Sequence, residues 1–510
     1  MTMKHIFLYG PPGAGKSSVG QVLAERLRWP FVDLDLEIER SAGQAIPQIV
    51  EQQGEAGFRN LETETLERAV NESPRVIALG GGALLRHENR MLAENNGKII
   101  LLMAEPTTLL ERLQSNDRKC PLLAGDLRSR LSALLEMRRE HYASFPLRIP
   151  VDGKSAQQKA RQAQMAAGRH HLSAMGEYDV VMDDVSSLKD FSMENPLIVT
   201  DENVAKFHAQ PVLDGLSASG LYPKLLTVRA GESYKTLDTV IQLWRGFVEA
   251  GLERKSTVIA LGGGVIGDLA GFAASTFMRG IDWVGVPTTL LAMVDSSLGG
   301  KTGFDLPEGK NLIGSFYPPR FVLIDPHLLE TLPGAEFISG MAEVLKYGII
   351  SDPELFALCG HGLDWIKANL EEVVQRAVAV KVAIIEEDPY EQGLRASLNL
   401  GHTVGHAVEL VSHFQLRHGE AVAIGMAAEA KLAERLKVAT QGLSEVVAGA
   451  LSALGLPSEI PRGLPRDELI RAMQMDKKRS KGVVRFALPV EIGRVELLDV
   501  TDLESVLEDG

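Results

Sequence analysis

Residues 5–17, HIFLYGPPGAGKS, decide the fold of the first part of the chain. The apolar run predicts a buried strand, and the GxxxxGKS pattern after it predicts a loop that opens a helix. Its glycines let backbone N–H groups face phosphate oxygens, and the helix N-terminus adds positive potential. We expect Lys16 to reach the terminal phosphates of a nucleotide and Ser17 to bind Mg²⁺. The segment predicts a nucleotide-binding α/β domain, and it leaves kinase, GTPase and motor functions open.

The pattern outward from this loop indicates three structural parts. Apolar runs at 31–35, 75–81 and 98–105 alternate with amphipathic stretches, as in a parallel α/β sheet. A second alternation begins near Pro196, and strong helix formers dominate after Thr331. We expect an α/β fold with a P-loop parallel-sheet domain at 1–160, a linker at 161–175, a Rossmann-like α/β domain at 176–330 and a mainly α-helical domain at 331–510.

The composition limits the partners and the compartment. The 510 residues exceed what one hydrophobic core usually serves, and a net charge of −14 offers no overall basic surface for nucleic acid. Two cysteines, Cys120 and Cys359, and the lack of a signal peptide favour the cytoplasm. The apolar stretch 256–277 holds five glycines and Asp268, so we expect a buried strand and helix there and no membrane span.

Residues beyond the phosphate loop predict an acceptor site. Asp33 and Asp35 alternate in the run 31–35, so we expect both on one face of a strand. One would then hold Mg²⁺ and the other an acceptor hydroxyl, although an ordinary acidic pair at a strand end is the alternative. The motif continues with Arg59, Glu62, the glycines 80–82, and Arg138 with Tyr142.

Taken together, these motifs resemble shikimate kinase over about residues 4–160. The resemblance implies a base, Asp35, near the 3-hydroxyl of shikimate, and arginines that bind its carboxylate in bidentate fashion. It assigns Ser17 and Asp33 to Mg²⁺. The implied ATP-binding residues are Gly13, Gly15, Lys16, Ser17 and Ser18, and the implied shikimate-binding residues are Asp35, Arg59, Gly81, Gly82 and Arg138.

One position departs from the kinase pattern. The family carries an arginine in a mobile lid directly before Pro-Leu-Leu, where this chain has Cys120. Arg118 and Lys119 precede it, so we expect a displaced cation, Arg118, to reach the nucleotide. A nucleotide-binding regulatory module without catalysis is the alternative for this part.

A second glycine-rich turn, LGGGVIGD at 261–268, follows an apolar strand and precedes a helix. A dinucleotide pyrophosphate could lie over the helix N-terminus, although tight packing alone explains such glycines equally well. The acid–cation pair Glu232 and Lys235 and the hydroxyls of 288–289 favour the cofactor. Two lysines and an asparagine in the glycine-rich stretch 295–311 favour a phosphorylated or carboxylated substrate.

Polar residues at helical spacing in the last part predict a metal site. Glu343 and Lys346 are three apart, and His402 and His406 are four apart, so each pair shares a helix face. His418 follows. From spacing alone, His402 and His406 form the expected zinc pair, with a carboxylate as third ligand.

The motifs GESYKT (231–236), LGGGVIGDLAGFAASTFMRG (261–280), GKNLIGSFYPP (309–319), GMAEVLKYG (340–348) and RASLNLGHTVGHAVE (395–409) resemble 3-dehydroquinate synthase over residues 176–510. The resemblance implies zinc, or cobalt, on Glu343, His402 and His418, and gives His406 to the substrate or a proton relay. The implied NAD⁺ residues are Asp201, Glu232, Lys235, Gly263, Gly264, Asp268, Thr288 and Thr289. The implied substrate residues are Asp295, Lys301, Lys310, Asn311, Lys346, Lys381, Arg395, Asn399, His406 and Lys477, with Arg279 reaching a neighbouring subunit's site in a homodimer.

The resemblances together imply a bifunctional enzyme of the shikimate pathway. One part phosphorylates shikimate with ATP and Mg²⁺. The other uses NAD⁺ and metal to convert 3-deoxy-D-arabino-heptulosonate 7-phosphate to 3-dehydroquinate and phosphate without net redox. A polyol dehydrogenase of the glycerol dehydrogenase type is the alternative for the second part. All the expected substrates are small anions.

Overall fold

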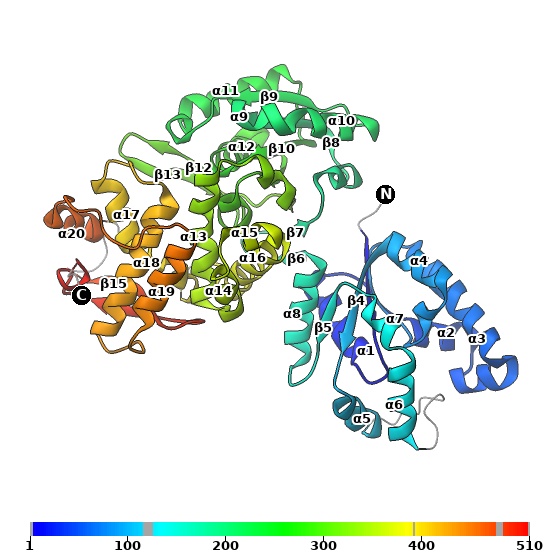
Figure 1. Cartoon of the computed structure of the whole chain (residues 1–510). Coiled ribbons are helices and arrows are strands. Elements are labelled where there is room, and N and C mark those ends of the chain that lie inside the picture. The colour runs from blue at the N-terminus through cyan, green and yellow to red at the C-terminus, as the bar shows by residue number, and fades with distance from the viewer. Residues whose placement is uncertain (1–3, 116–125, 391–392, 476–482, 508–510) are drawn as a thin grey trace. The chain divides into compact units, whose positions relative to one another are not determined.

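The computed structural model describes residues 4–115, 126–390, 393–475 and 483–507. The chain divides into two compact units, Met1–His171 and Leu172–Gly510, and each is described by itself (Figure 1). Among the described helices none is long and apolar enough to cross a membrane.

The first unit is built on a parallel five-stranded sheet of order β2-β3-β1-β4-β5. The central strand β1 is buried on both faces. Ile6 and Leu8 point into one core and Phe7 and Tyr9 into the other, as the two-residue period of a strand requires. The strands are β1 His5–Tyr9, β2 Phe31–Asp33, β3 Val76–Ala78, β4 Gly97–Met103 and β5 Arg148–Pro150.

Helices cover both faces of this sheet. Leu23 and Ala163 bring α1 and α8 onto one face, and Ile38, Leu66 and Tyr142 bring α2, α3 and α7 onto the other. The phosphate loop and the end of β2 therefore lie at the carboxyl edge of the sheet. The helices are α1 Lys16–Leu27, α2 Leu34–Ala42, α3 Ile46–Val70, α4 His87–Asn96, α5 Pro106–Gln114, α6 Leu127–Met137, α7 Arg139–Ala143 and α8 Ala156–Ala167.

The expected placement of the two aspartates on one strand face is wrong. Strand β2 ends at Asp33, whose side chain accepts the backbone N–H of Leu36 as the N-cap of α2. Asp35 lies in the first turn of that helix, where a carboxylate is favoured by the helix dipole. The capping preference of Asp33 thus decides the local structure here, and the alternation of apolar residues does not. Asp33 reaches the edge of the sheet from the N-cap of α2, and Asp35 from the first turn of that helix.

The residues expected to form a linker have regular structure. The segment 161–167 belongs to α8, which begins with a capping box at Ser155 and buries Ala160, Ala163 and Ala167. Strand β6 follows at 169–172, where the first unit ends. The small alanines that suggested a linker are what lets this helix pack closely on the sheet.

A second sheet has seven strands in the order β6-β7-β14-β11-β10-β8-β9, and all of them except β6, which spans residue 171, lie within the second unit. Its inner strands β10 and β11 are mostly apolar and buried because helices cover them. The predicted strand, glycine turn and helix are confirmed: β10 ends at Gly262 and α12 begins at Gly264. The strands are β6 Arg169–Leu172, β7 Tyr178–Met182, β8 Glu194–Asp201, β9 Lys224–Val228, β10 Ser256–Gly262, β11 Asp282–Pro287 and β14 Phe321–Ile324.

Shorter elements complete the α/β part of this unit. The antiparallel hairpin β12–β13 leads from the glycine-rich stretch back to the sheet (Figure 1). The elements are α9 Glu202–Val204, α10 Gln210–Ala218, α11 Leu237–Glu249, α12 Gly264–Thr276, β12 Lys301–Leu306 and β13 Gly309–Phe316.

The remainder is mainly helical, as expected. One continuous core joins the sheet to these helices, since Ile259 and Val322 belong to the same cluster as Val344 and Met426. The helices are α13 Gly334–Ile350, α14 Pro353–Cys359, α15 Leu363–Ala368, α16 Leu370–Glu387, α17 His402–Val411, α18 His418–Arg435, α19 Leu443–Ala453 and α20 Arg466–Met475. The sequence reading missed one hairpin, β15 Val484–Glu491 with β16 Arg494–Val500.

Candidate functional sites

The phosphate loop connects β1 to α1 around the side chain of its own lysine. Lys16 Nζ donates to the carbonyl oxygens of Gly10 at 3.0 Å and Pro11 at 3.1 Å. Gly13 and Gly15 have φ of 82° and 91°, a backbone region that glycine enters freely. Ser17 Oγ donates to Asp33 Oδ2 at 2.5 Å, so the two expected Mg²⁺ ligands are adjacent. A hydroxyl beside a carboxylate is a donor set that fits a hard cation.

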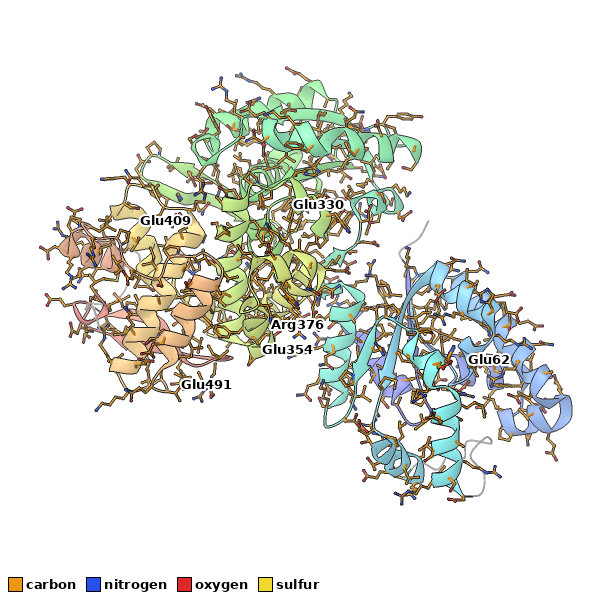
Figure 2. All side chains as sticks on the ribbon, viewed as in Figure 1. Glu62, Glu330, Glu354, Arg376, Glu409 and Glu491 are labelled. Atoms are coloured by element: carbon orange, nitrogen blue, oxygen red, sulfur yellow. The ribbon has the colours of Figure 1, made fainter. Side chains whose placement is uncertain are left out.

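The acceptor pocket brings together Asp35, Arg59 and the glycines that follow β3. A Cβ on Gly80 would lie 2.8 Å from Asp35 Oδ1 and 2.8 Å from Glu62 Oε1. Glu62, which is labelled in Figure 2, is fully buried, and its Oε2 accepts a hydrogen bond from Arg59 Nη1 at 2.7 Å. Burial raises the pKa of Asp35, and the Lys16 charge opposes the rise. Burial also raises the pKa of Glu62, against the Arg59 charge.

The carbonyl of Gly81 fixes the second arginine of this pocket. Arg138 Nη1 donates to that oxygen at 2.6 Å, and the hydroxyls of Tyr9 and Tyr142 donate to it at 3.3 and 3.4 Å. Arg138 is 8% exposed. Arg59 on α3 and Arg138 in the turn between α6 and α7 therefore approach the glycines 80–82 from separate segments, as two clamps on one carboxylate require.

A methyl group at Gly82 is expected to weaken shikimate binding. The Cβ of Gly82→Ala would lie 2.6 Å from Arg59 Nη2, so the guanidinium must move from its place beside Glu62. We expect KM for shikimate to rise about tenfold, the equivalent of about 1.4 kcal/mol, with KM for ATP little changed. Initial rates of ADP release measure both, and the synthase activity of the same protein is the internal control. Equal rises in the two KM values would contradict the assignment.

Sequence reasoning missed Arg112 and gave Glu62 no role. Arg112 on α5 donates to the Gly13 carbonyl at 3.4 Å, so a cation lies against the phosphate loop. Arg118 and Cys120 lie outside the described residues. The i,i+3 spacing of Arg59 and Glu62 was the available signal for the second residue.

The turn between β10 and α12 forms a glycine cradle. Gly263 is the N-cap of α12, and a Cβ on Gly264 would lie 2.8 Å from Ser296 Oγ. The buried hydroxyls of Ser296 and Thr288 have no hydrogen-bond partner among the described residues. Gly263, Gly264 and Ser296 line a cavity together with Asp268 and Lys301. Unsatisfied hydroxyls beside a helix N-terminus fit a dinucleotide.

Lys235 connects this cradle to the hairpin. Its Nζ lies 2.6 Å from Asp268 Oδ2 and donates to Asn311 Oδ1 at 2.5 Å. The backbone N–H of Asn311 donates to Asp305 Oδ1 at 2.7 Å, and that of Asp305 to the Lys235 carbonyl at 2.8 Å. The expected cofactor residues and an expected substrate residue are thus one hydrogen-bonded group. Burial raises the pKa of Asp268 to about 6, against the Lys235 charge.

The Lys235–Asp268 pair predicts a pH dependence of NAD⁺ binding. Lys235 is 4% exposed, and removing the charge of Asp268 would leave the Lys235 ammonium buried without its ion-pair partner. Ionised Asp268 holds the pair above pH about 6, so we expect affinity to fall about tenfold on acidification through that pH. Asp268→Asn should bind weakly at every pH. Calorimetric titration measures this, with the exposed Asp238→Asn as control, and a pH-independent wild-type Kd would contradict it.

Other expected cofactor residues form hydrogen bonds to the backbone around them or lie in exposed loops. Asp201 caps α9 by accepting the N–H groups of Asn203 and Val204, and Thr289 Oγ1 accepts Ala292 N–H at 3.1 Å. Glu232 is exposed beside Gly231, which has φ of 113°. These residues lie at the carboxyl edge of the sheet or in the loops next to it, as the resemblance implies.

Three residues converge on a metal-binding geometry. The ligand atoms of Glu343, His402 and His418 lie within 4.8 Å of one another. Each imidazole turns Nε2 toward Glu343 Oε1, at 3.6 Å for His402 and 3.7 Å for His418. Glu343 is fully buried on α13, and its carboxylate is also paired with Lys346. A buried carboxylate and two imidazoles fit zinc or cobalt.

The metal pair expected from spacing alone is half wrong. His402 and His406 share a face of α17 with their rings 5.2 Å apart, but no metal cluster among the described residues contains both. His406 instead belongs to a second trio with Glu409 and His418. The third ligand comes from α18, because the chain returns after α17 and starts the next helix with His418 beside Glu343.

The expected substrate residues form a buried charged group next to the metal site. Lys381 Nζ lies 2.5 Å from Asp295 Oδ1, which also accepts the hydroxyl of Tyr347 at 2.5 Å. Burial opposes ionisation of Asp295, but Lys381 and Lys346 hold its pKa well below the usual range. A Cβ on Gly299 would lie 3.0 Å from Arg395, so this guanidinium lies against the glycine-rich stretch.

Several expected residues are exposed, among them Lys301, Asn399 and Arg279, and Lys477 is not described. Lys301 starts β12, Asn399 ends a short 3₁₀ helix over Leu394–Asn399, and Arg279 has a left-handed backbone, φ 71°. An exposed arginine held outward is compatible with contact to another subunit. Lys477 lies outside the described residues.

Three family models match successive parts of the chain: shikimate kinase at residues 12–167, 3-dehydroquinate synthase N-terminal at 225–339 and 3-dehydroquinate synthase C-terminal at 340–479. The 3-dehydroquinate synthase of Nostoc sp. (strain PCC 7120) is 48% identical over 310 residues, which are 59% of this chain and 85% of that protein.

Two solved structures resemble the second unit. The 2-deoxy-scyllo-inosose synthase complexed with carbaglucose-6-phosphate, NAD⁺ and Co²⁺ has a TM-score of 0.61, is 27% identical, and covers 66% of this chain and 99% of its own. The 2-epi-5-epi-valiolone synthase from Streptomyces hygroscopicus, with NAD⁺ and Zn²⁺ bound, has a TM-score of 0.59, is 30% identical, and covers 64% and 94%. The chain belongs to the 3-dehydroquinate synthase family and carries a shikimate kinase domain ahead of its synthase part.

Proposed function

We propose that this chain catalyses two reactions of aromatic biosynthesis at two separate sites. The first unit phosphorylates shikimate to shikimate 3-phosphate, and the second converts 3-deoxy-D-arabino-heptulosonate 7-phosphate to 3-dehydroquinate and phosphate. The observation that carries this proposal is the presence of two separate clusters, one at the carboxyl edge of the sheet in the first unit and one on the helices α13, α17 and α18 of the second. Lys16, Asp35, Arg59 and Arg138 belong to the first, and Glu343, His402 and His418 to the second.

At the kinase site, the residues position and neutralise two anions. Lys16 leaves its loop carbonyls for the nucleotide phosphates, and Ser17 and Asp33 hold the cation that ATP brings. Arg59 and Arg138 orient the carboxylate of shikimate, so that its hydroxyl faces Asp35. The buried surroundings that raise the pKa of Asp35 suit a group that takes a proton from that hydroxyl.

At the synthase site, NAD⁺ when bound accepts and returns a hydride, and zinc or cobalt polarises the oxygen of the alcohol concerned. The chain's own residues do the rest. Glu343, His402 and His418 would hold the metal, and the glycine cradle with Lys235 and Asp268 would hold the dinucleotide. The basic side chains of Lys301, Lys346 and Arg395 would bind the phosphate and carboxylate of the substrate. His406, whose ring lies 5.2 Å from that of His402 and which is not in the Glu343 cluster, would move a proton.

We also propose a homodimer formed through the synthase unit, to which Arg279 contributes, and a cytoplasmic location. The first rests on the exposed position and left-handed backbone of Arg279, and the second on the low cysteine content, with only Cys120 and Cys359, far apart in the sequence. Sedimentation of the wild type beside Arg279→Ala, with synthase activity measured in parallel, tests the dimer.

A paired assay on the purified chain tests the function. We expect ADP release that depends on shikimate, and phosphate release from the heptulosonate phosphate without NADH accumulation. Steady NADH production from a polyol would favour a dehydrogenase. ATP binding without shikimate turnover would favour a regulatory nucleotide-binding module in the first unit.

A further inference from the structure

We infer that Glu409 is a positioning residue that joins the metal ligand His418 to Lys310 on the hairpin β12–β13. One buried carboxylate would then orient an imidazole of the metal site and hold the loop that binds the substrate. The inference deepens the proposed synthase function and rests on its metal site.

Glu409 lies between the two groups. It is on α17, two turns after His402, and is 6% exposed (Figure 2). Its Oε2 is 3.4 Å from Nδ1 of His418, and its Oε1 is 3.5 Å from Nζ of Lys310. Each carboxylate oxygen thus has a separate partner, one from α18 and one from the hairpin.

The contact with His418 sets the direction of the imidazole. With Nδ1 bound to Glu409, Nε2 is left to face Glu343 at 3.7 Å. The two ring nitrogens of His402 are used in the same way: Nδ1 faces the carbonyl oxygen of Leu400 at 3.1 Å, and Nε2 faces Glu343. A second group that fixes the ring orientation and raises ligand basicity typically changes metal affinity by 10- to 100-fold. Because the acceptor at His418 is charged, its effect should be the larger of the two.

The contact with Lys310 is supported by the turn after α17. Lys310 Nζ also lies 4.5 Å from the ring centroid of Phe414. His413 and Phe414 have φ of 53° and 58°, an uncommon conformation for two consecutive non-glycine residues. The N–H of Phe414 donates to the Glu409 carbonyl at 2.8 Å, which ties the turn to the same residue. The end of α17 and the turn after it therefore form the binding surface for the Lys310 ammonium.

The hairpin extends this connection toward the cofactor cradle. Asn311, next to Lys310, accepts from Lys235, which is paired with Asp268. Lys310 is 41% exposed, so its ion pair contributes little to stability. The ion pair instead fixes the position of the hairpin β12–β13, so its loss should weaken substrate binding.

Glu409 could instead be a ligand itself, because His406, Glu409 and His418 also lie within 4.8 Å. The geometry favours the outer position: both imidazoles turn Nε2 to the fully buried Glu343, and Glu409 meets Nδ1 of His418 and is paired with a cation. The experiment separates the two roles by the size of the loss.

Metal-free protein is titrated with Co²⁺ and followed by its visible absorption, for the wild type, Glu409→Ala, Glu409→Gln and His402→Ala. We expect Glu409→Ala to bind Co²⁺ 10- to 100-fold more weakly, with a changed absorption band. Glu409→Gln should lose less, because its amide oxygen still accepts the Nδ1–H. Both variants should raise KM for the heptulosonate phosphate about two- to fivefold. The control is Glu420→Ala, a carboxylate two residues after His418 that contacts Arg417.

Unchanged Co²⁺ affinity and KM in a folded Glu409→Ala, with kinase activity intact, would overturn the inference. Loss of Co²⁺ binding as complete as in His402→Ala would also overturn it, because Glu409 would then be a ligand. If the wild type bound no Co²⁺, the proposed metal site would fail, and this inference with it. The three failures give different titrations and cannot be confused.

Discussion

Replacing His402 with alanine is expected to remove the metal and abolish synthase turnover while kinase turnover remains. Its Nε2 is one of only two imidazole nitrogens that face the buried Glu343 carboxylate in the described clusters. Loss of a ligand from a three-residue set leaves Glu343 and His418 alone, too few for tight binding. We expect synthase kcat/KM to fall at least about 1000-fold, the equivalent of about 4 kcal/mol. Metal content by elemental analysis and phosphate release measure the two effects.

A matched control separates metal loss from unfolding. His361 is exposed between α14 and α15, where its ring lies tilted against that of Trp365, and it belongs to no metal cluster among the described residues. His361→Ala should keep full metal content and synthase activity. If His402→Ala retained stoichiometric metal and normal turnover, the assigned ligand set would be wrong. Loss of kinase activity as well would contradict two independent sites.

Local spacing was enough to predict the elements that carry both sites. The loop at 10–17 and the turn at 261–268 are each an unbroken stretch of sequence. In each, the buried strand, the glycines and the start of the helix follow one another directly, and the structure has both as expected. The same reasoning failed at Asp33 and Asp35, because helix capping and strand alternation make opposite demands on the same five residues. The hairpin near the carboxyl end was not predicted, although its two-residue turn, Ile492–Gly493, carries a glycine with a positive φ of 94°.

The metal site shows where spacing stops being informative. His418 meets Glu343 across 75 positions of sequence, a contact that only the packing of α13 against α18 creates. The family resemblance supplied it, and spacing did not. Glu409 is different, because it stands seven residues after His402 and three after His406 on one helical face. The sequence contains that signal, but spacing alone predicted only an unspecified carboxylate as the third ligand, and Glu409 was given no role.

Replacing Lys16 with alanine is expected to abolish kinase turnover and leave the synthase unaffected. The ammonium is the one cation that the loop itself provides, and its contacts to the Gly10 and Pro11 carbonyls hold it at the place where phosphates would enter. Without it, charge developing on the transferred phosphoryl group is uncompensated. We expect kcat with shikimate to fall about 1000-fold, the equivalent of about 4 kcal/mol.

The control for this change is Lys154→Ala. Lys154 lies in the same unit, and its Nζ donates to Gln162 Oε1 at 3.0 Å, away from the phosphate loop. Its removal should leave ADP release unchanged. Neither Lys16→Ala nor Lys154→Ala should alter phosphate release by the synthase. Retention of kinase turnover within tenfold in Lys16→Ala would assign phosphate stabilisation to another cation, and the candidate is Arg112, which donates to the Gly13 carbonyl. The double variant Lys16→Ala with Arg112→Ala would then lose the remainder, because both side chains contact carbonyl oxygens of the same loop and would act on the same anion.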